Sequence, residues 1–481
     1  MKILLVNPPH YFDGKSRLPS FFPLGLAYIA RYLVNRGHDV EVFDIWANQW
    51  DKTVTQEKIK ELTYDVVGIS SLSTQYGYVK WLIEKFKRHR EMSPIVIGGA
   101  LPTLSPQVVL NHTFADICII GEGEITFPDL LEHMGSWKSV KGIAYKDGGE
   151  IKTSSPRNYI RDLDKIEFPL REIFPVDIYL KYGSLDGYPD IKSMNLITGR
   201  GCPYNCDFCS KVFLRRRERS PENVAEEIEM LKEKYNIKAI FFNDELLVSS
   251  KPRMYRLLEH IKPLNILWQG QARVNTVDLE LLKEMKNAGC IKIGLGIESG
   301  SQSILNKMNK RTTVEQNIKA IKAVKKAGID PIIQSIYGYE GENNNTLNET
   351  IEFFKKADTT HEGFFVLTPL PGTKLYDRCI EKGMISDEDE YLTNLEAGYN
   401  PDRNVLINLT EFNTGKEFYE KKKMLEQQVG WNYFKRHPLN TVSVRTPGNN
   451  IIKIPLILAL MGPNWYKWIL KSRDKLRVSG K

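Results

Sequence analysis

Three cysteines in one short stretch constrain this chain more than any other feature of its sequence. Residues 201–209 read Gly-Cys-Pro-Tyr-Asn-Cys-Asp-Phe-Cys, so Cys202, Cys206 and Cys209 have the spacing Cys-x3-Cys-x2-Cys. Four cysteine thiolates would complete the ligand set of an iron–sulfur cubane. Three leave one iron without a protein ligand, and an open coordination position is what a catalytic metal site requires. The spacing therefore predicts one cluster with one open iron.

Two other interpretations of these cysteines fit the sequence less well. A zinc site needs a fourth Cys or His nearby, and the nearest histidines, His112 and His260, are not in a paired ligand motif. A disulfide framework does not suit a chain of 481 residues with six cysteines and no secretory signal. The other three cysteines, Cys118, Cys290 and Cys379, stand alone and are predicted to be small buried residues.

The composition predicts a globular protein of two or three domains. The chain is 42% hydrophobic and 26% charged, and it is too long for one ordinary core. The first residues carry one lysine and a short apolar run, which predicts a β-strand and not a signal peptide. We therefore expect a cytoplasmic protein, where thiols stay reduced. The net charge of +8 is spread along the chain, which predicts a solvated surface and leaves an acidic substrate or a membrane surface as alternatives. We expect no nucleic-acid partner.

Residues 1–135 alternate strand and helix patterns, which predicts an α/β domain with a doubly wound parallel sheet. Ligands of such sheets bind outside the carboxyl ends of the strands. The predicted strands are residues 3–7, 39–43, 66–70, 95–97 and 117–120. The loops after them are small, polar and rich in glycine, so that the backbone can approach a large ligand. The candidate ligand-binding residues there are Asn7, Pro8, Ser71, Ser73, Thr74, Gln75, Gly98, Gly99, Gly121, Glu122 and Gly123.

A dinucleotide site is the alternative for this first domain. Asp44, at the end of the second predicted strand, would suit a ribose. No Gly-x-Gly-x-x-Gly motif follows the first strand, which argues against this alternative.

From residue 193 to about residue 385 the alternation resumes with a longer period, which predicts an open (β/α)6 barrel with its site at the carboxyl ends of the strands. One helix is predicted to begin at Ser220, followed by Pro221 in its first turn, and another at Thr312, with Glu315 completing a capping box. The predicted strands are residues 194–198, 239–242, 266–269, 291–297, 331–337 and 363–367.

Polar or glycine-rich groups follow successive strands of this predicted barrel. Each alone has a simpler explanation, such as a helix cap or a surface ion pair, but their order after the cysteine loop favours one shared ligand site. The candidate residues are Asp244, Glu245, Gln271, Arg273, Glu298, Ser299, Gly338, Thr368 and Pro369.

The cysteine motif and these strand ends resemble the radical S-adenosylmethionine (radical SAM) family. The resemblance implies a [4Fe–4S] cluster held by the three cysteines, with SAM chelating the open iron and cleaved to a 5′-deoxyadenosyl radical. It assigns Asp244 and Glu245 to the SAM amino group and the Arg273 guanidinium to its carboxylate, with Gln271 at the same strand end. Glu298, which Ser299 follows, is assigned to the ribose or methionyl end. The loops at Gly338 and at Thr368-Pro369 would form the adenine wall.

The first domain resembles the cobalamin-binding domain at the N-terminus of a radical SAM subfamily. The matching segments are residues 7–9, 22–26, 71–75, 98–103 and 121–124. The chain lacks the Asp-x-His-x-x-Gly motif of classical cobalamin proteins, and His38 begins a strand and is a poor cobalt ligand. The resemblance therefore implies cobalamin without a protein histidine on cobalt.

Two further segments complete the predicted organisation. Residues 136–192 are a connector that contains a hairpin turn at residues 146–149. Residues 386–481 are predicted to be mainly helical, with a charged helix at residues 416–429, and to cover the active site. The apolar run at 451–461 is too short to span a bilayer. Trp465, Trp468 and nearby lysines and arginines follow it, so a peripheral membrane contact and a lipid-like or tetrapyrrole-like substrate are a second expectation for this tail.

The predicted function is a cobalamin-dependent radical SAM enzyme that methylates an unactivated carbon. It would need an electron donor such as a flavodoxin or ferredoxin and would act on a small-molecule or lipid-like substrate. One alternative is a radical SAM cyclase or carbon–carbon coupling enzyme, similar to the anaerobic magnesium-protoporphyrin ester cyclases. Another is a non-catalytic iron–sulfur or zinc-binding module. The sequence identifies no general acid or base.

Overall fold

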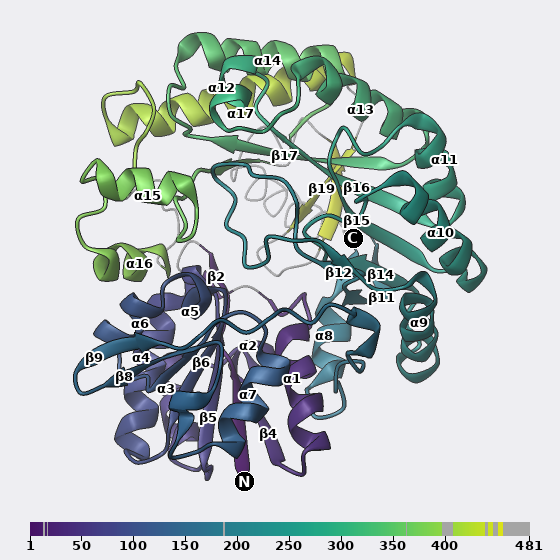
Figure 1. Ribbon diagram of the computed structural model, residues 1–481. Coiled ribbons are helices and arrows are strands. Elements are labelled where there is room, and N and C mark those ends of the chain that lie inside the picture. The colour runs from purple at the N-terminus through teal and green to yellow at the C-terminus, as the bar shows by residue number, and fades with distance from the viewer. Residues whose placement is uncertain are drawn as a thin grey trace, which may run out of the picture. The chain divides into compact units, whose positions relative to one another are not determined.

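The computed structural model describes residues 1–12, 15–16, 18–185, 188–361, 363–396, 407–437, 441–445 and 451–455. The chain forms two compact units. The first comprises Met1–Gly183, Ser193–Ile266 and Thr368–Ile407, and the second comprises Ser184–Lys192, Leu267–Leu367 and Asn408–Lys481. Figure 1 labels most of their helices and strands.

A sheet of mostly parallel strands forms the centre of the first unit. Its order is β4-β1-β5-β6-β7-β8-β9, and the pairs from β4 to β7 are parallel whereas β7, β8 and β9 pair antiparallel. Residues 3–6 of β1 are at most 1% exposed, as expected for a strand covered on both faces. The strands are β1 (Lys2–Asn7), β4 (Asp39–Asp44), β5 (Val66–Ser71), β6 (Ile95–Gly99), β7 (Ile117–Ile119), β8 (Ile143–Asp147) and β9 (Glu150–Thr153).

Helices lie on both sides of this sheet (Figure 1), with α1 against α7 and α3 against α4. Helix α1 ends just before Gly37, whose positive φ of 77° suits a residue without a side chain. The helices are α1 (Leu24–Asn35), α2 (Ile45–Asn48), α3 (Lys52–Ile59), α4 (Tyr76–His89), α5 (Ala100–Leu104), α6 (Pro106–His112), α7 (Gly123–Glu132) and α8 (Val176–Tyr182). The short 3-10 turns are η1 (Ser73–Gln75), η2 (Trp137–Ser139) and η3 (Leu163–Lys165), and β2 (Tyr11–Phe12) pairs with β3 (Lys15–Ser16).

The first unit also contains the start of the second strand–helix series. Residues 193–196 of β11 (Tyr188–Leu196) pair in parallel with β14 (Ala239–Phe242). Helix α9 (Pro221–Tyr235) begins as predicted, with the Asn223 backbone N–H donating to Ser220 Oγ at 3.1 Å. Its other elements are β12 (Gly199–Arg200), β13 (Arg217–Glu218), α10 (Lys251–Ile261), η4 (Lys262–Leu264), α15 (Lys374–Glu381) and α16 (Glu388–Glu396).

The second unit continues this series with parallel pairs β15–β16, β16–β17 and β17–β18. Helix α13 begins one residue later than predicted. Thr313, and not Thr312, is the cap, because Gln316 rather than Glu315 reaches back to its backbone N–H at 3.0 Å. The elements are β10 (Ser184–Leu185), β15 (Leu267–Ala272), α11 (Leu279–Asn287), β16 (Cys290–Glu298), α12 (Gln302–Lys307), α13 (Val314–Lys326), β17 (Asp330–Tyr337), α14 (Asn344–Ala357), β18 (Phe364–Val366), α17 (Gly415–Arg436), β19 (Thr441–Arg445) and β20 (Ile451–Pro455).

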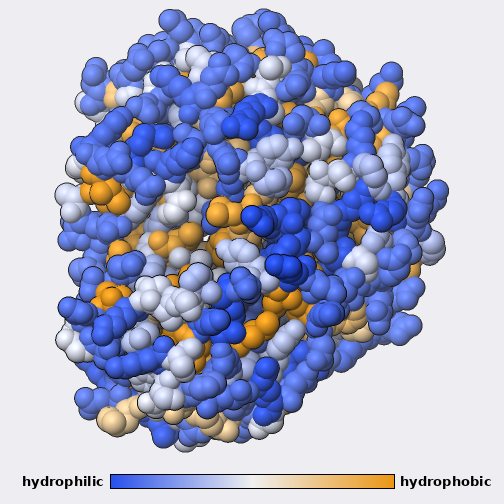
Figure 2. Space-filling model, viewed as in Figure 1, coloured by the Kyte–Doolittle hydropathy of each residue, from blue (hydrophilic) through white to orange (hydrophobic). Residues whose placement is uncertain are grey.

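These elements confirm the predicted fold class, an α/β sheet domain followed by six strand–helix repeats. Strands β8 and β9 continue the first sheet past residue 135, into the segment predicted as a connector. Helix α17 confirms the charged helix, and Cys118, Cys290 and Cys379 are buried as predicted. Hydrophilic residues cover most of the face shown in Figure 2, as the composition predicts. Trp465, Trp468 and the basic residues after them lie outside the described residues.

Candidate cofactor site

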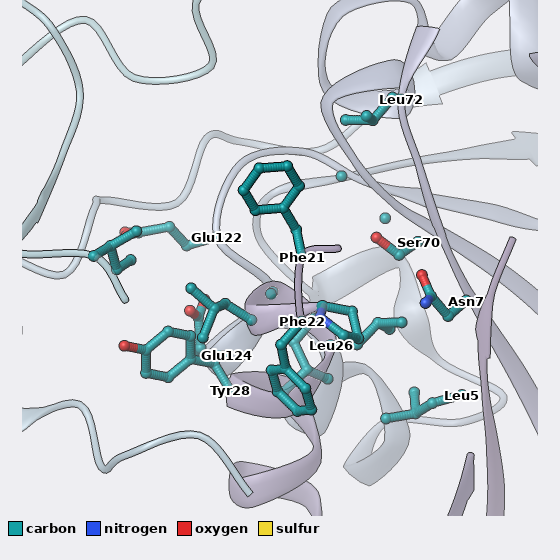
Figure 3. Close-up of a pocket in the computed structure, with 18 of the residues that line it drawn as sticks. Leu5, Asn7, Phe21, Phe22, Leu26, Tyr28, Ser70, Leu72, Glu122 and Glu124 are labelled. Atoms are coloured by element: carbon teal, nitrogen blue, oxygen red, sulfur yellow. The ribbon is translucent and has the colours of Figure 1, made fainter. Parts of the chain in front are cut away.

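The first unit contains a cavity of about 600 Å³. It lies at the carboxyl ends of β1, β5, β6 and β7, the edge at which such sheets bind ligands. Figure 3 shows Phe21, Phe22, Leu26 and Tyr28 on one part of its wall and Leu5, Asn7 and Ser70 on another. Of the predicted cofactor-binding residues, those that line this cavity are Asn7, Gln75, Gly98, Gly99, Gly121, Glu122, Gly123 and Glu245.

Four of the residues predicted to bind a ligand on the first domain do not line the cavity, namely Pro8, Ser71, Ser73 and Thr74. Ser70, in β5, and Leu72, just after it, line the cavity instead. His10 also lines the cavity, with its ring centroid 4.2 Å from that of Trp46, whereas His38 does not.

Glycines give the cavity the close backbone approach that a large flat ligand needs. A Cβ atom built on Gly98 or on Gly25 would meet no protein atom within 4 Å, so side chains there would take up open space. Gly99 has φ of 102°, and a Cβ atom on it would lie 2.5 Å from the backbone oxygen of Ser71. The protein backbone therefore requires glycine at position 99, whereas glycine at position 98 leaves open space that suits a large flat ligand.

Asn7 has a structural role at this edge. Its Nδ2 donates to Asp44 Oδ1 at 2.9 Å and to the Tyr179 hydroxyl at 3.0 Å, and that hydroxyl donates to Asp44 Oδ2 at 2.6 Å. Burial raises the pKa of Asp44 and also that of Tyr179. This closed network attaches α8, from the predicted connector, to the carboxyl ends of β1 and β4.

Gln75 connects two of the loops around the cavity. Its Oε1 accepts from the Leu72 backbone N–H at 2.8 Å, and its Nε2 donates to the backbone oxygens of Pro8 and Pro9 at 3.3 and 3.1 Å. The side chain is 3% exposed. Gln75 and Pro8 therefore belong to the frame that holds the loops after β1 and β5 in place.

The three cysteines lie on the loop 201–216, between β12 and β13. Cys202 and Cys206 are half-buried and Cys209 is exposed. The Leu375 backbone N–H donates to the backbone oxygen of Asp207 at 3.1 Å, and Ser210 Oγ donates to the backbone oxygen of Pro371 at 3.1 Å. Thiols are the donors that iron–sulfur clusters take. Within the described ranges, no three Cys, His, Asp or Glu side chains already form a metal-ligand arrangement, so the ligand assignment stays a prediction.

Asp244 and Glu245 have different environments. Asp244 is buried, and its carboxylate accepts from the Thr198 backbone N–H and hydroxyl and from Arg216 Nη2, each at 2.9 Å. Glu245 lines the cavity, accepts from the Gly201 backbone N–H, and has its pKa raised by burial. Asp244 thus supports the loop that leads to the cysteines, and Glu245 is the acid of the pair that lines the cavity.

The second unit carries the other predicted SAM residues at the carboxyl ends of β15, β16 and β17. Gln271 is half-buried and Arg273 is buried. Glu298, with φ of 63°, accepts from Lys310 Nζ at 2.6 Å, and Ser299 Oγ accepts from the Ser301 backbone N–H at 3.1 Å. The SAM roles of these residues stay predictions.

Glu342 is a buried acid in the loop that begins at Gly338, and no role was predicted for its side chain. The Gly338 backbone N–H donates to Glu342 Oε2 at 2.6 Å, and burial raises the pKa of Glu342 to about 8. The remaining predicted pair, Thr368 and Pro369, belongs to the first unit, where the Pro369 oxygen accepts from the Tyr391 hydroxyl at 2.7 Å.

Comparison with known proteins gives the class of the chain. Residues 196–354 match the Radical SAM superfamily, and residues 15–131 match the B12 binding domain. An uncharacterized methyltransferase of Pyrococcus horikoshii is 35% identical over 396 residues, which are 80% of this chain and 84% of that protein. The chain therefore belongs to the family of radical SAM enzymes with a B12-binding domain.

Other relatives differ in their reactions. The anaerobic magnesium-protoporphyrin IX monomethyl ester cyclase of Rubrivivax gelatinosus is 29% identical over 408 residues, which are 81% of this chain and 72% of the cyclase. The fold is also that of a radical S-adenosylmethionine methyltransferase of Kitasatospora setae, solved with cobalamin and a [4Fe–4S] cluster bound. The TM-score is 0.64 and the identity 18%, with 79% of this chain and 75% of that chain covered.

The chain is thus an enzyme whose cofactors are a [4Fe–4S] cluster, SAM and cobalamin. The alternative of a non-catalytic metal module is set aside by this membership. The glycine-lined cavity fits cobalamin, and the three thiols of the loop fit the cluster. None of the helices within the described ranges has both the length and the apolar character that a membrane crossing requires.

Proposed function

We propose that this chain transfers a methyl group to a carbon atom of a small-molecule substrate. One observation carries the proposal: the cavity on the B12-binding domain shares its wall with the base of the cysteine loop. Gly199, Arg200 and Phe213, which flank or belong to that loop, line the same cavity as Gly98 and Gly121. When bound, the cluster with SAM supplies a radical that removes a hydrogen atom from carbon, and cobalamin supplies the methyl group.

The residues of the chain would hold and separate these reactants. The glycines at the carboxyl ends of the strands, Gly98, Gly99 and Gly121, would let the backbone contact the corrin directly. Glu245 would accept hydrogen bonds from the SAM ammonium, because it lines the cavity whereas the carboxylate of Asp244 already accepts from Thr198 and Arg216. Arg273 would pair with the SAM carboxylate. The apolar residues around Phe21 and Phe22 would exclude water from the cavity.

The organisation of the chain is part of this proposal. We divide it into a cobalamin-binding domain at 1–135, a connector at 136–192 whose strands β8 and β9 extend the sheet of that domain, a radical SAM barrel at 193–385 and a C-terminal region at 386–481. An acidic electron carrier such as a flavodoxin or ferredoxin would reduce the cluster. The C-terminal region would border the substrate entrance, with a peripheral membrane contact if the substrate is lipid-like.

The experiment is anaerobic turnover with SAM that carries a deuterated methyl group. Methyl transfer through cobalamin consumes one SAM for the radical and one for remethylation, so 5′-deoxyadenosine and S-adenosylhomocysteine should appear in near-equal amounts. The product should carry the deuterated methyl. A reaction that releases neither S-adenosylhomocysteine nor labelled product would refute the proposal.

Cyclisation is the second candidate function, and the similarity to the Rubrivivax gelatinosus cyclase over 81% of this chain favours it. A cyclase would release 5′-deoxyadenosine and an unmethylated, ring-closed product. The same turnover experiment therefore separates the two functions.

A further inference from the structure

Two arginines hold the base of the cysteine loop to one acidic side chain of the B12-binding domain. Arg200 enters the loop and Arg217 leaves it, and they face each other in the β12–β13 pair. Glu122 Oε1 accepts from Arg200 Nη1 at 2.7 Å and from Arg217 Nη1 at 2.8 Å, and Glu122 Oε2 accepts from Arg217 at 2.9 Å. One carboxylate therefore fixes both ends of the segment that carries the cysteines.

This cluster is buried and compensated in charge. Glu124 accepts from Arg200 Nη2 at 2.6 Å, so that two acids face two arginines. Glu122, Glu124 and Arg200 are each less than 9% exposed. The Arg200 guanidinium also lies over the Tyr28 ring, 5.3 Å from its centroid. Removal of one partner from such a buried pair leaves an uncompensated charge.

Glu122 differs from a second buried acid at the same loop base. Glu227 accepts from Arg219 Nη1 at 2.5 Å and from Arg171 Nη2 at 2.7 Å, and its side chain is fully buried. Glu122 and Arg200 line the cavity, whereas Glu227, Arg171 and Arg219 do not. Of these two acids, Glu122 therefore contacts both the cavity and the base of the cysteine loop, whereas Glu227 contacts the loop base alone.

We propose that Glu122 is a positioning residue that couples occupation of the cavity to the order of the cysteine segment 202–209. This inference rests on the proposed function, because it takes cobalamin as the ligand of the cavity. A bound corrin restricts the Glu122 and Arg200 side chains, and these hold the backbone that continues into Gly201 and Cys202. Because coupling between two sites is reciprocal, the factor by which cobalamin tightens cluster binding equals the factor by which the cluster tightens cobalamin binding.

The test compares backbone hydrogen exchange of the full-length chain, before cluster assembly, with and without hydroxocobalamin. The segment 202–209 is the readout, since none of its residues lines the cavity. In the wild type, hydroxocobalamin should slow exchange there by about 2- to 30-fold, the range expected for coupling through packed networks. At saturating hydroxocobalamin, Glu122→Gln should lose this slowing, and Glu122→Asp, which keeps the charge, should restore part of it.

Glu227→Gln is the matched control, because it removes an equally buried acid from the same loop base. It should lower stability but keep the slowing at 202–209. An unchanged slowing in Glu122→Gln, or equal loss in both variants, would overturn the coupling. Loss of binding in Glu122→Gln alone would make Glu122 part of the cobalamin site and would also overturn it. If the wild type itself does not bind hydroxocobalamin, the proposed function fails first, and the coupling fails with it.

Discussion

The buried acid Glu342 makes the stability of the second unit depend on pH, and this dependence can be measured. It is 3% exposed and holds the Gly338 backbone N–H at the carboxyl end of β17, where the adenine wall is predicted. Burial raises its pKa from the model-compound value of 4.5 to about 8. Folded chains therefore keep a proton on Glu342 at neutral pH, whereas unfolded chains have lost it.

The sign and size of the effect follow from proton linkage. Because the folded state binds more protons between pH 4.5 and pH 8, stability decreases as the pH rises through that window. The full difference corresponds to roughly 5 kcal/mol at about 1.4 kcal/mol per pKa unit. Between pH 6 and pH 8 the loss is about 2 kcal/mol.

Glu342→Gln keeps the shape and hydrogen-bonding oxygen of the protonated side chain and cannot ionise. We expect the variant to melt at a higher temperature than the wild type, and we expect this difference to grow from pH 6 to pH 8. At pH 8 it should reach several degrees. Glu349→Gln, at an exposed position of α14, is the control and should follow the wild type. A constant difference between Glu342→Gln and the wild type across this range would refute the argument.

Three other predictions follow from the first unit. Replacement of the three motif cysteines with alanine should abolish iron–sulfur absorbance and SAM cleavage, and a variant that still carries about four irons per chain would contradict the ligand assignment. Gly98→Val should leave the melting temperature nearly unchanged, because its Cβ meets no protein atom, yet weaken hydroxocobalamin binding by at least about tenfold; unchanged affinity in a titration would place the corrin elsewhere. Tyr179→Phe should lower the free energy of unfolding of the first unit by about 1–3 kcal/mol, because buried Asp44 loses a hydrogen-bond donor at 2.6 Å. A denaturation curve equal to that of the wild type would show that this network does not stabilise the unit.

Periodicity and capping residues were sufficient to predict most elements. The β14 range of residues 239–242 was predicted to the residue, and Ser220 begins α9 because its hydroxyl, followed by proline, satisfies the first turn. Thr312 and Thr313 are both capable caps, so the sequence could not decide which would lie in the extended conformation. Strands β8 and β9 join the first sheet through long-range pairing, which no local pattern indicates.

The site was predicted at the level of loops rather than side-chain roles. Glycine-rich strand ends correctly indicated the cavity, because Gly98 and Gly121 line it. The roles of Asn7 and Glu122 were missed because their partners, Tyr179 and Arg217, lie far away in sequence. The arginines on both sides of the cysteine loop could have indicated this role of Glu122, because buried arginines at the base of a loop require acidic partners.

The central claim is that the cobalamin cavity and the cysteine loop adjoin within one unit. Electron paramagnetic resonance of the anaerobically reconstituted chain tests it directly, with the cluster reduced and cobalamin held as Co(II). The account predicts faster spin relaxation and broadened signals for both centres relative to samples that contain only one of them. A spectrum equal to the sum of the two separate spectra would contradict the account.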